Sequence, residues 1–182
     1  SVSILTGSKL DFAKRDTYLR IPLKKREMLH DLYRSEFAQE RYDKIMKNAE
    51  TDLTQAEVTE AVKTEQFLLT ITENGFGKRT STHEYRITNR GGSGVLNIIT
   101  SPRNGSVVSS FSVDSTDQIM LITDKGTLIR CPINDVRIAG RNTQGVTIFR
   151  TNKGDSIVSV ALISDSFSDE DESSDEEVNE AE

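Results

Sequence analysis

The sequence predicts a mainly β fold with two four-stranded, propeller-like blades, an α-helical insertion and a disordered acidic tail. The main observation is an internal repeat, because residues 66–112 recur at 117–161, with a shift of 51 positions over the first part of the repeat. A period of roughly 40–50 residues with several short strands per unit is typical of propeller arrays. Nine residues of the first copy recur unchanged: Ile71, Thr72, Gly75, Arg79, Arg86, Ile87, Arg90, Gly94 and Val95. A fold needs the apolar residues and glycines, whereas the arginines exceed what a core requires and indicate function.

Residues 1–9 are expected to form the last strand of a preceding blade. The segment Ser1–Leu5 matches Ser159–Ile163, the end of the second copy. There is also no initiator methionine. We therefore expect the chain to be the C-terminal part of a longer protein.

Residues 10–64 are expected to form a helical insertion or linker. A helix start is predicted at Ser8–Asp11, Pro22 suits the first residue of a second helix, and Thr54-x-x-Glu57 is a capping box. The run Lys24-Lys25-Arg26 either contacts a polyanion or is the solvated face of a helix. Apolar residues at spacings of three and four predict an amphipathic stripe: Leu29, Leu32, Tyr33, Phe37, Tyr42, Ile45 and Met46.

Residues 65–113 are expected to be the penultimate blade and 114–164 the last one. In the first copy, strands are predicted over 66–72, 84–88, 94–100 and 106–113. In the second, they are predicted over 117–123, 127–131, 145–151 and 156–163. Asn74-Gly75 predicts a type I′ hairpin, in which both central residues need a positive φ.

Charge is distributed unevenly along the chain. Residues 165–182 contain ten acidic and no basic residues, whereas residues 65–164 have 11 Lys and Arg against 8 Asp and Glu. The net charge of −6 therefore comes from the tail, which has too few apolar residues to fold. The single cysteine, Cys131, fits a reducing compartment and a buried strand position. No apolar run reaches the roughly 18 residues of a membrane span, so no membrane role is predicted.

No catalytic or metal-binding residues are predicted. Gly75–Thr80 resembles a phosphate-binding loop, but Thr72 and Arg79 stand where the Walker pattern needs a glycine and a Ser or Thr. His30 and His83 have no partner at metal-ligand spacing, and Cys131 has no histidine near it.

The repeated arginines instead predict binding of duplex DNA through phosphate contacts, with glycines that let the backbone approach closely. The blades lack the stacked aromatic residues of single-strand binders. An alternative for Arg86 and Arg137 is an inter-blade salt bridge with Glu84 and Asp135. The candidate DNA-binding residues are Lys78, Arg79, Arg86, Arg90, Gly91, Gly92, Gly94, Arg130, Arg137, Arg141 and Arg150.

Residues 65–164 resemble the C-terminal domain of the DNA gyrase A protein. The resemblance is carried by three motifs: Glu73–Thr80, Arg90–Gly94 and Gly140–Val146. It implies a β-pinwheel whose basic rim wraps duplex DNA and supports ATP-dependent negative supercoiling. It also implies a gyrase A dimer with gyrase B in an A2B2 assembly, in the bacterial cytoplasm on the nucleoid.

The resemblance implies that the catalytic tyrosine, ATP and Mg²⁺ belong to other parts of the enzyme. The four tyrosines of this chain lack the family's catalytic context: Tyr18, Tyr33, Tyr42 and Tyr85. The acidic tail is expected to modulate wrapping by competing with DNA.

The sequence departs from the family pattern in two places. The helical segment interrupts the array, and Asn89–Gly94 only partly matches the family's glycine-rich box because Ser93 stands where the box has lysine. Two alternatives therefore remain: the C-terminal domain of the gyrase A counterpart in topoisomerase IV, and a protein-interaction propeller without a DNA role.

Overall fold

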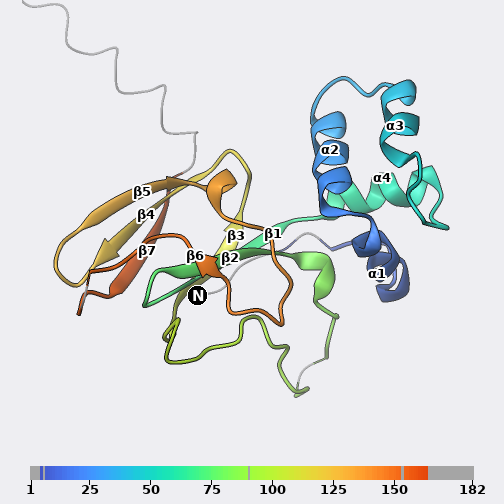
Figure 1. The fold of residues 1–182 in the computed structure, drawn as a ribbon. Coiled ribbons are helices and arrows are strands. Elements are labelled where there is room, and N and C mark those ends of the chain that lie inside the picture. Colours follow the sequence, from blue (N-terminus) through green and yellow to red (C-terminus); the bar gives the residue numbers. More distant parts are fainter. Residues whose placement is uncertain (1–4, 6, 90, 153, 164–182) are drawn as a thin grey trace, which may run out of the picture.

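The computed structural model describes residues 5, 7–89, 91–152 and 154–163. The tail at 165–182 and most of the strand expected over 1–9 lie outside these residues. Four helices gather at one end of the molecule, and two antiparallel sheets lie beyond them (Figure 1). The prediction of a mainly β fold with a helical part is therefore confirmed.

The helical unit comprises α1 (Phe12–Arg20), α2 (Leu23–Arg34), α3 (Gln39–Met46) and α4 (Gln55–Thr64). Asp11 caps α1 by accepting a hydrogen bond from the Lys14 amide, and Thr54 and Glu57 form the predicted capping box of α4. Pro22 is the N-cap of α2, one position before the predicted one. The apolar stripe is split between α2 and α3 and forms a core of its own, in which Leu29 and Leu32 are fully buried.

The first sheet has the strand order β3-β1-β2-β6, and the second has the order β5-β4-β7. The first repeat supplies β1 (Phe67–Thr72), β2 (Phe76–Ser81) and β3 (Val107–Val113). The second supplies β4 (Gln118–Thr123), β5 (Leu128–Pro132), β6 (Val146–Thr147) and β7 (Ile157–Ile163). The short strand β6 pairs with β2, so the second repeat completes the sheet of the first.

Two strand predictions are wrong. Residues 84–88 follow a 3-10 helix, η1 (Thr82–Glu84), and residues 94–100 have no regular structure; η2 (Ile133–Asp135) is the equivalent of η1 in the second repeat. Val95 and Leu96 are equivalent to β6, and β6 is a strand because it lies against β2 of the other repeat. No described residues offer Val95 and Leu96 such an edge.

The hairpin between β1 and β2 also differs from the prediction. Gly75 has φ +76°, but Asn74 is not among the described residues with positive φ, so the type I′ prediction is wrong. The Gly75 amide instead donates to the Thr72 carbonyl at 3.1 Å. The repeated acidic positions next to these turns have a structural role: Glu73 accepts from the Ser106 amide, and Asp124 accepts from the Ser156 amide.

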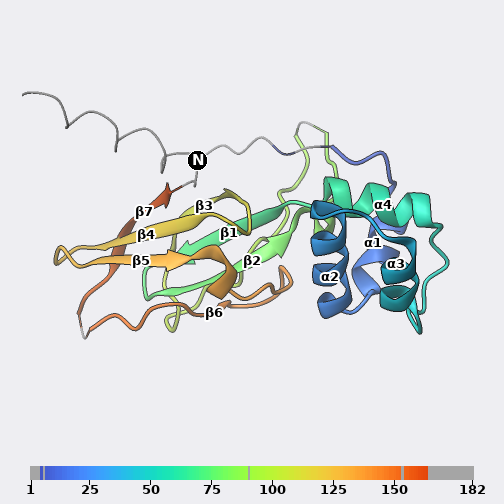
Figure 2. The same ribbon diagram turned by 90° about the horizontal axis from the view of Figure 1, so that it is seen from above.

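The two repeats share one hydrophobic core. Leu69 and Ile71 from the first repeat and Ile119 and Leu121 from the second are all fully buried in the same cluster. Figure 2 shows the two sheets side by side, with the helical unit beyond the β1 and β2 end. Each repeat therefore depends on the other for its burial.

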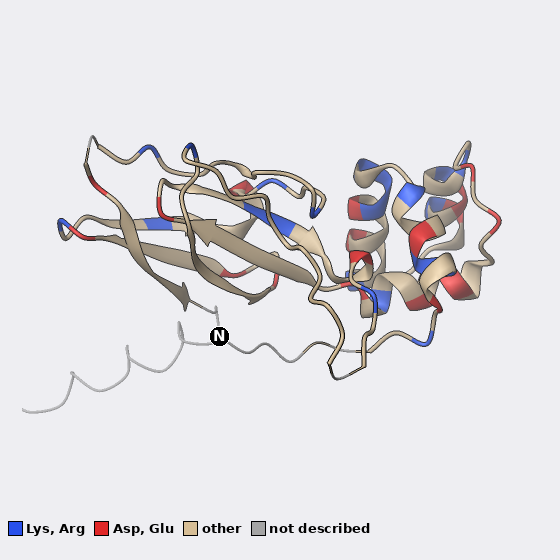
Figure 3. Ribbon diagram, turned by 90° about the horizontal axis from the view of Figure 1, so that it is seen from below, with Lys and Arg blue, Asp and Glu red and all other residues tan. Residues whose placement is uncertain are grey.

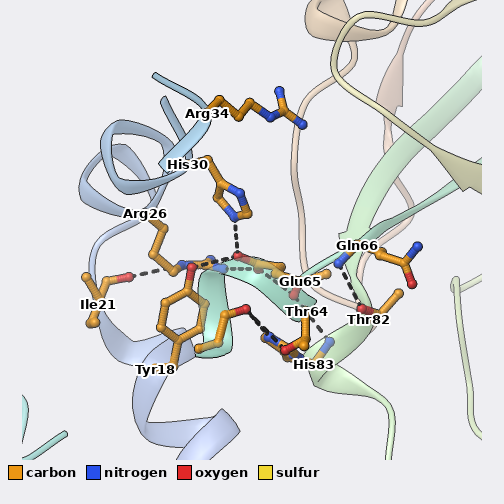
Figure 4. Close-up of polar contacts among 12 residues, drawn as sticks. Tyr18, Ile21, Arg26, His30, Arg34, Thr64, Glu65, Gln66, Thr82 and His83 are labelled. Carbon is orange, nitrogen blue, oxygen red and sulfur yellow. Dashed lines mark hydrogen bonds and ion pairs between the residues drawn. The ribbon is translucent and has the colours of Figure 1, made fainter. Parts of the chain in front are cut away.

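Glu65 joins the helical unit to the first sheet (Figure 4). Its buried carboxylate accepts hydrogen bonds from Tyr18 Oη at 2.8 Å, Arg26 Nη1 at 2.7 Å and Ser81 Oγ at 2.6 Å, and it lies 2.7 Å from His30 Nε2. Burial alone would raise the pKa of this carboxyl group. The hydrogen bonds and the positive charge of Arg26 outweigh burial and hold the pKa of Glu65 at about 2.

Candidate nucleic-acid interface

Lys78 lies in the seam between the two repeats. Its side chain is fully buried, and its Nζ donates to the carbonyls of Gly140 (2.6 Å) and Arg141 (2.9 Å) and to Thr143 Oγ1 (3.2 Å). Three protein acceptors satisfy the three donors of an ammonium group. The structure therefore gives Lys78 a role between the repeats in place of the predicted phosphate contact.

Arg79 lies in the same seam. Its Nε donates to the Val136 carbonyl at 2.7 Å, and its backbone amide donates to the Arg137 carbonyl at 3.0 Å. Only 7% of the residue is exposed, and burial lowers the pKa of its guanidinium. Arg79 thus also binds the neighbouring repeat in place of the predicted phosphate contact.

Arg141 is half-buried in the same seam, where its carbonyl accepts from Lys78. Its amide donates to Glu84 Oε2 at 2.9 Å, its Nη1 donates to the Leu96 carbonyl at 3.0 Å, and its guanidinium lies over the Tyr85 ring. Its Nε is 3.9 Å from Glu84 Oε2, so Arg141 forms the ion pair that the sequence alternative assigned to Arg86. Arg141 is therefore mainly an inter-repeat contact.

Burial lowers the pKa of Lys78 to about 8 from its ordinary value of 10.5. Above this pKa the unfolded chain binds more protons at this residue than the folded chain. The free energy of unfolding therefore gains a contribution that rises with pH between about 8 and 10.5. In the Lys78→Met variant, the free energy of unfolding should lack this rise. Chemical denaturation of the variant and the unsubstituted chain at about pH 7 and about pH 9.5 measures the difference. Parallel pH curves for the variant and the unsubstituted chain would contradict it.

Four other predicted residues are exposed, namely Arg86, Arg130, Arg137 and Arg150. Arg130 Nε donates to Gln118 Oε1 of the neighbouring strand β4 at 2.6 Å. Among the described residues, neither Arg86 nor Arg137 makes an ion pair with Glu84 or Asp135, within a repeat or between repeats, and Glu84 pairs with Arg141. The salt-bridge alternative for this pair is therefore wrong, and both guanidiniums are available at the surface.

The exposed charge of the β part is mainly positive. Within the described part of 66–163, six basic side chains are exposed against three acidic ones. The other acidic residues are half-buried or buried, and Glu73 and Glu84 are held by backbone amides. Figure 3 shows the two signs interspersed on the helices and mostly basic segments on the loops along one side of the sheets. The six basic residues are Arg86, Arg103, Lys125, Arg130, Arg137 and Arg150.

The glycine-rich segment is exposed as expected for close backbone approach. Gly91, Gly92 and Gly94 are all exposed, and a Cβ on Gly91 or Gly94 would meet no atom within 4 Å. Gly91 has φ +78°, which favours glycine for its conformation alone. Arg90, the predicted arginine of this segment, lies outside the described residues.

One exposed arginine was not predicted as a site residue. Arg103 lies in the segment before β3, and its guanidinium is 5.0 Å from the centre of the ring of Phe76, the first residue of β2. Stacking on a ring holds the planar donor group in place while leaving its edge free for a phosphate. The positions equivalent to Arg103 at shifts of 50 and 51 are Lys153 and Gly154, so a search for repeated arginines does not identify it.

The described residues contain no group of three His, Cys, Asp or Glu side chains placed to hold a metal ion. His30 faces Glu65, and His83 Nε2 lies 2.9 Å from the Ala61 carbonyl. Cys131 is half-buried, and burial raises the pKa of its thiol. None of the helices in the described part is long and apolar enough to cross a membrane.

Comparison with known proteins gives concordant matches. Residues 66–114 and 117–164 match the family model of the DNA gyrase C-terminal domain, a β-propeller. The DNA gyrase A protein of Rickettsia bellii is 44% identical over 174 residues, which cover 96% of this chain and 18% of that protein. The gyrase A protein of Haemophilus influenzae is 49% identical over 117 residues, covering 63% of this chain and 13% of its own length.

A solved structure of the DNA gyrase A C-terminal domain matches 54% of this chain and 33% of its own, with a TM-score of 0.50 and 28% identity. The chain thus spans less than a fifth of the length of the two curated relatives. The Rickettsia match extends over most of the helical unit as well, because it leaves out only 4% of the chain.

Proposed function

Since the chain belongs to the DNA gyrase C-terminal domain family of β-propellers, we propose that it binds and wraps duplex DNA. The observation that carries this proposal is the separation of charge in the β part. The acidic side chains Glu73 and Glu84 are bound by turns and by the seam, whereas Arg86, Arg137 and Arg150 are exposed. Duplex DNA carries one charge per roughly 1.7 Å of axis, so exposed arginines on successive repeats suit it.

Within a complete enzyme, the chain acts as part of the gyrase A protein of a type II topoisomerase, dimeric and joined by gyrase B in an A2B2 assembly. It works in the bacterial cytoplasm on the nucleoid. Its contribution to supercoiling is wrapping, while cleavage by tyrosine and the use of ATP and Mg²⁺ take place on other parts of the assembly. The topoisomerase IV alternative is not favoured, because the curated relatives described above are DNA gyrase A proteins.

The proposal is tested by replacing Arg86, Arg137 and Arg150 together with alanine. Each lost phosphate contact reduces the slope of log K against log salt by about 0.9, so the triple variant should lose between two and three units of slope. Its affinity for a linear duplex at low salt should fall at least about tenfold. Fluorescence anisotropy at several salt concentrations measures both quantities.

The matched control replaces three exposed basic residues of the helical unit, Arg20, Arg41 and Lys44. This variant has the same change in net charge but leaves the β part intact. Equal losses of affinity in the two variants, or binding that does not respond to salt, would refute the proposed interface. Thermal unfolding of both variants should match the unsubstituted chain, because these exposed side chains make few contacts.

A further inference from the structure

In the seam between the two repeats, an arginine of the first repeat binds the end of a 3-10 helix of the second. The 3-10 helix η2 of the second repeat ends at Asp135, and Arg79 of the first repeat donates to the carbonyl of its C-cap residue, Val136, at 2.7 Å. The guanidinium lies 5.9 Å from the centre of the Phe67 ring, which comes from the same sheet as Arg79. A buried arginine of one repeat thus holds the end of the 3-10 helix in the next.

The equivalent point of the first repeat has a different partner. The 3-10 helix η1 ends at Glu84, and its C-cap residue, Tyr85, is equivalent to Val136 by the shift of 51 positions. Arg15 Nη1 from α1 donates to the Tyr85 carbonyl at 3.2 Å. The helical unit therefore binds the Tyr85 carbonyl of the first repeat, which is equivalent to the Val136 carbonyl that Arg79 binds in the second repeat.

The two arginines also share their surroundings. Each is 7% exposed, and each guanidinium lies near a phenylalanine ring: Phe12 of the same helix, 5.7 Å from Arg15, and Phe67 of the neighbouring strand for Arg79. They reach the carbonyls from unrelated backbones, since Arg15 is on a helix and Arg79 is on a strand. The similarity therefore lies in the guanidinium and its acceptor.

The correspondence between the helical unit and a neighbouring repeat is limited to the arginine contact. In the second repeat, the strand part of the seam is covered, because the Arg79 amide binds the Arg137 carbonyl and the Arg79 carbonyl binds the Ala139 amide. In the first repeat, the equivalent residues Arg86 to Thr88 are exposed, and Ile87 is 81% exposed. The helical unit thus covers the end of η1 and leaves the adjoining strand-like segment uncovered by described residues.

We propose that the helical unit is a built-in substitute for a neighbouring repeat, in which Arg15 takes the place at Tyr85 that Arg79 takes at Val136. The helical insertion is then a structural part of the array, because it binds the residue after η1 in the first repeat as the first repeat binds the residue after η2 in the second. A β-repeat that docks on the first repeat finds this carbonyl already bound by α1. This inference is independent of DNA binding.

The test compares Arg15→Ala with Arg79→Ala in the whole chain by NMR. Arg15→Ala should shift the carbonyl carbon resonance of Tyr85 and accelerate exchange of the Tyr85 amide, which closes η1 through its bond to the Thr82 carbonyl at 3.1 Å. Arg79→Ala should have the same effects on the carbonyl resonance and amide exchange of Val136, whose amide donates to the Ile133 carbonyl at 3.0 Å. We expect an acceleration of about tenfold in each case, confined to the 3-10 helix concerned.

Arg20→Ala is the matched control, because Arg20 is on the same helix but exposed and paired with Asp16. It should leave both carbonyl resonances unchanged. Arg15→Lys, which retains a charged donor, should restore part of the protection at Tyr85. The proposal is overturned if Arg15→Ala leaves Tyr85 unchanged, or if lysine restores no protection and exchange rises throughout α1, since Arg15 would then only stabilise its own helix.

Discussion

Replacing Glu65 by alanine is expected to lower the free energy of unfolding by about 3–5 kcal/mol, the range for breaking a buried ion pair from one side. The variant leaves the Arg26 guanidinium, which is largely buried, without its counter-charge. It also removes the acceptor of the Tyr18 and Ser81 hydroxyl groups. Urea denaturation followed by circular dichroism measures the loss.

Glu57→Ala is the control for this measurement, because it removes another carboxylate of the helical unit. Glu57 closes the capping box of α4 and pairs with Lys14 at the surface, so its loss should cost about 1 kcal/mol. If Glu65→Ala costs no more than Glu57→Ala, the junction does not depend on the buried carboxylate.

The pKa of about 2 adds a pH dependence to the same residue. A carboxyl group whose pKa is lower in the folded than in the unfolded chain stabilises the fold above its unfolded value, here near 4.5. This stabilisation is lost as the pH falls from about 4.5 towards 2. The unsubstituted chain should therefore lose stability more steeply than Glu65→Gln over this window.

Replacing Gly75 by alanine is expected to have the second large effect, a loss of about 2–5 kcal/mol from backbone strain and overpacking together. Gly75 has φ +76°, and a Cβ built on it would clash with the Phe149 carbonyl oxygen. That oxygen belongs to the backbone of the second repeat, so it cannot move aside as a flexible side chain can. Thermal unfolding of the variant measures the effect.

The repeat provides a matched control for this substitution. Gly126 is the equivalent residue of the second repeat and has φ +81°, but a Cβ on it would meet no atom within 4 Å. Gly126→Ala should therefore cost only the conformational strain, about 1–2 kcal/mol. The difference between the two variants isolates the packing of the seam, and equal losses would show that the seam tolerates a methyl group there.

Local features of the fold could be predicted from the sequence, because their causes are local. The capping box needs only Thr54 and Glu57, three residues apart, and the helix start at Asp11 needs only the next turn. The prediction of a type I′ turn at Asn74-Gly75 is wrong, because it requires a positive φ at both residues. The glycine alone supplies the positive φ, and the Thr72 carbonyl closes the turn.

The candidate site was harder to predict, because burial depends on which neighbour a residue has. Arg79 and Arg130 are the same residue type at equivalent positions, but the second repeat covers Arg79 and no described residue covers Arg130. Lys78 and Arg141 are likewise drawn into the seam by contacts more than 50 positions away. Periodicity identified the repeated arginines, and only the arrangement of the repeats separates seam contacts from surface charge.

The pairing of β6 with β2 has a consequence for synthesis of the chain. A ribosome releases the first repeat before the second, and domains generally fold as units during translation. The first sheet, however, gains its fourth strand only when Val146 and Thr147 have emerged. Until then the β2 edge, with the polar side chain of Lys78, has no partner from the second repeat. The two repeats are therefore expected to complete their folding in a single step, after Val146 and Thr147 have been synthesised.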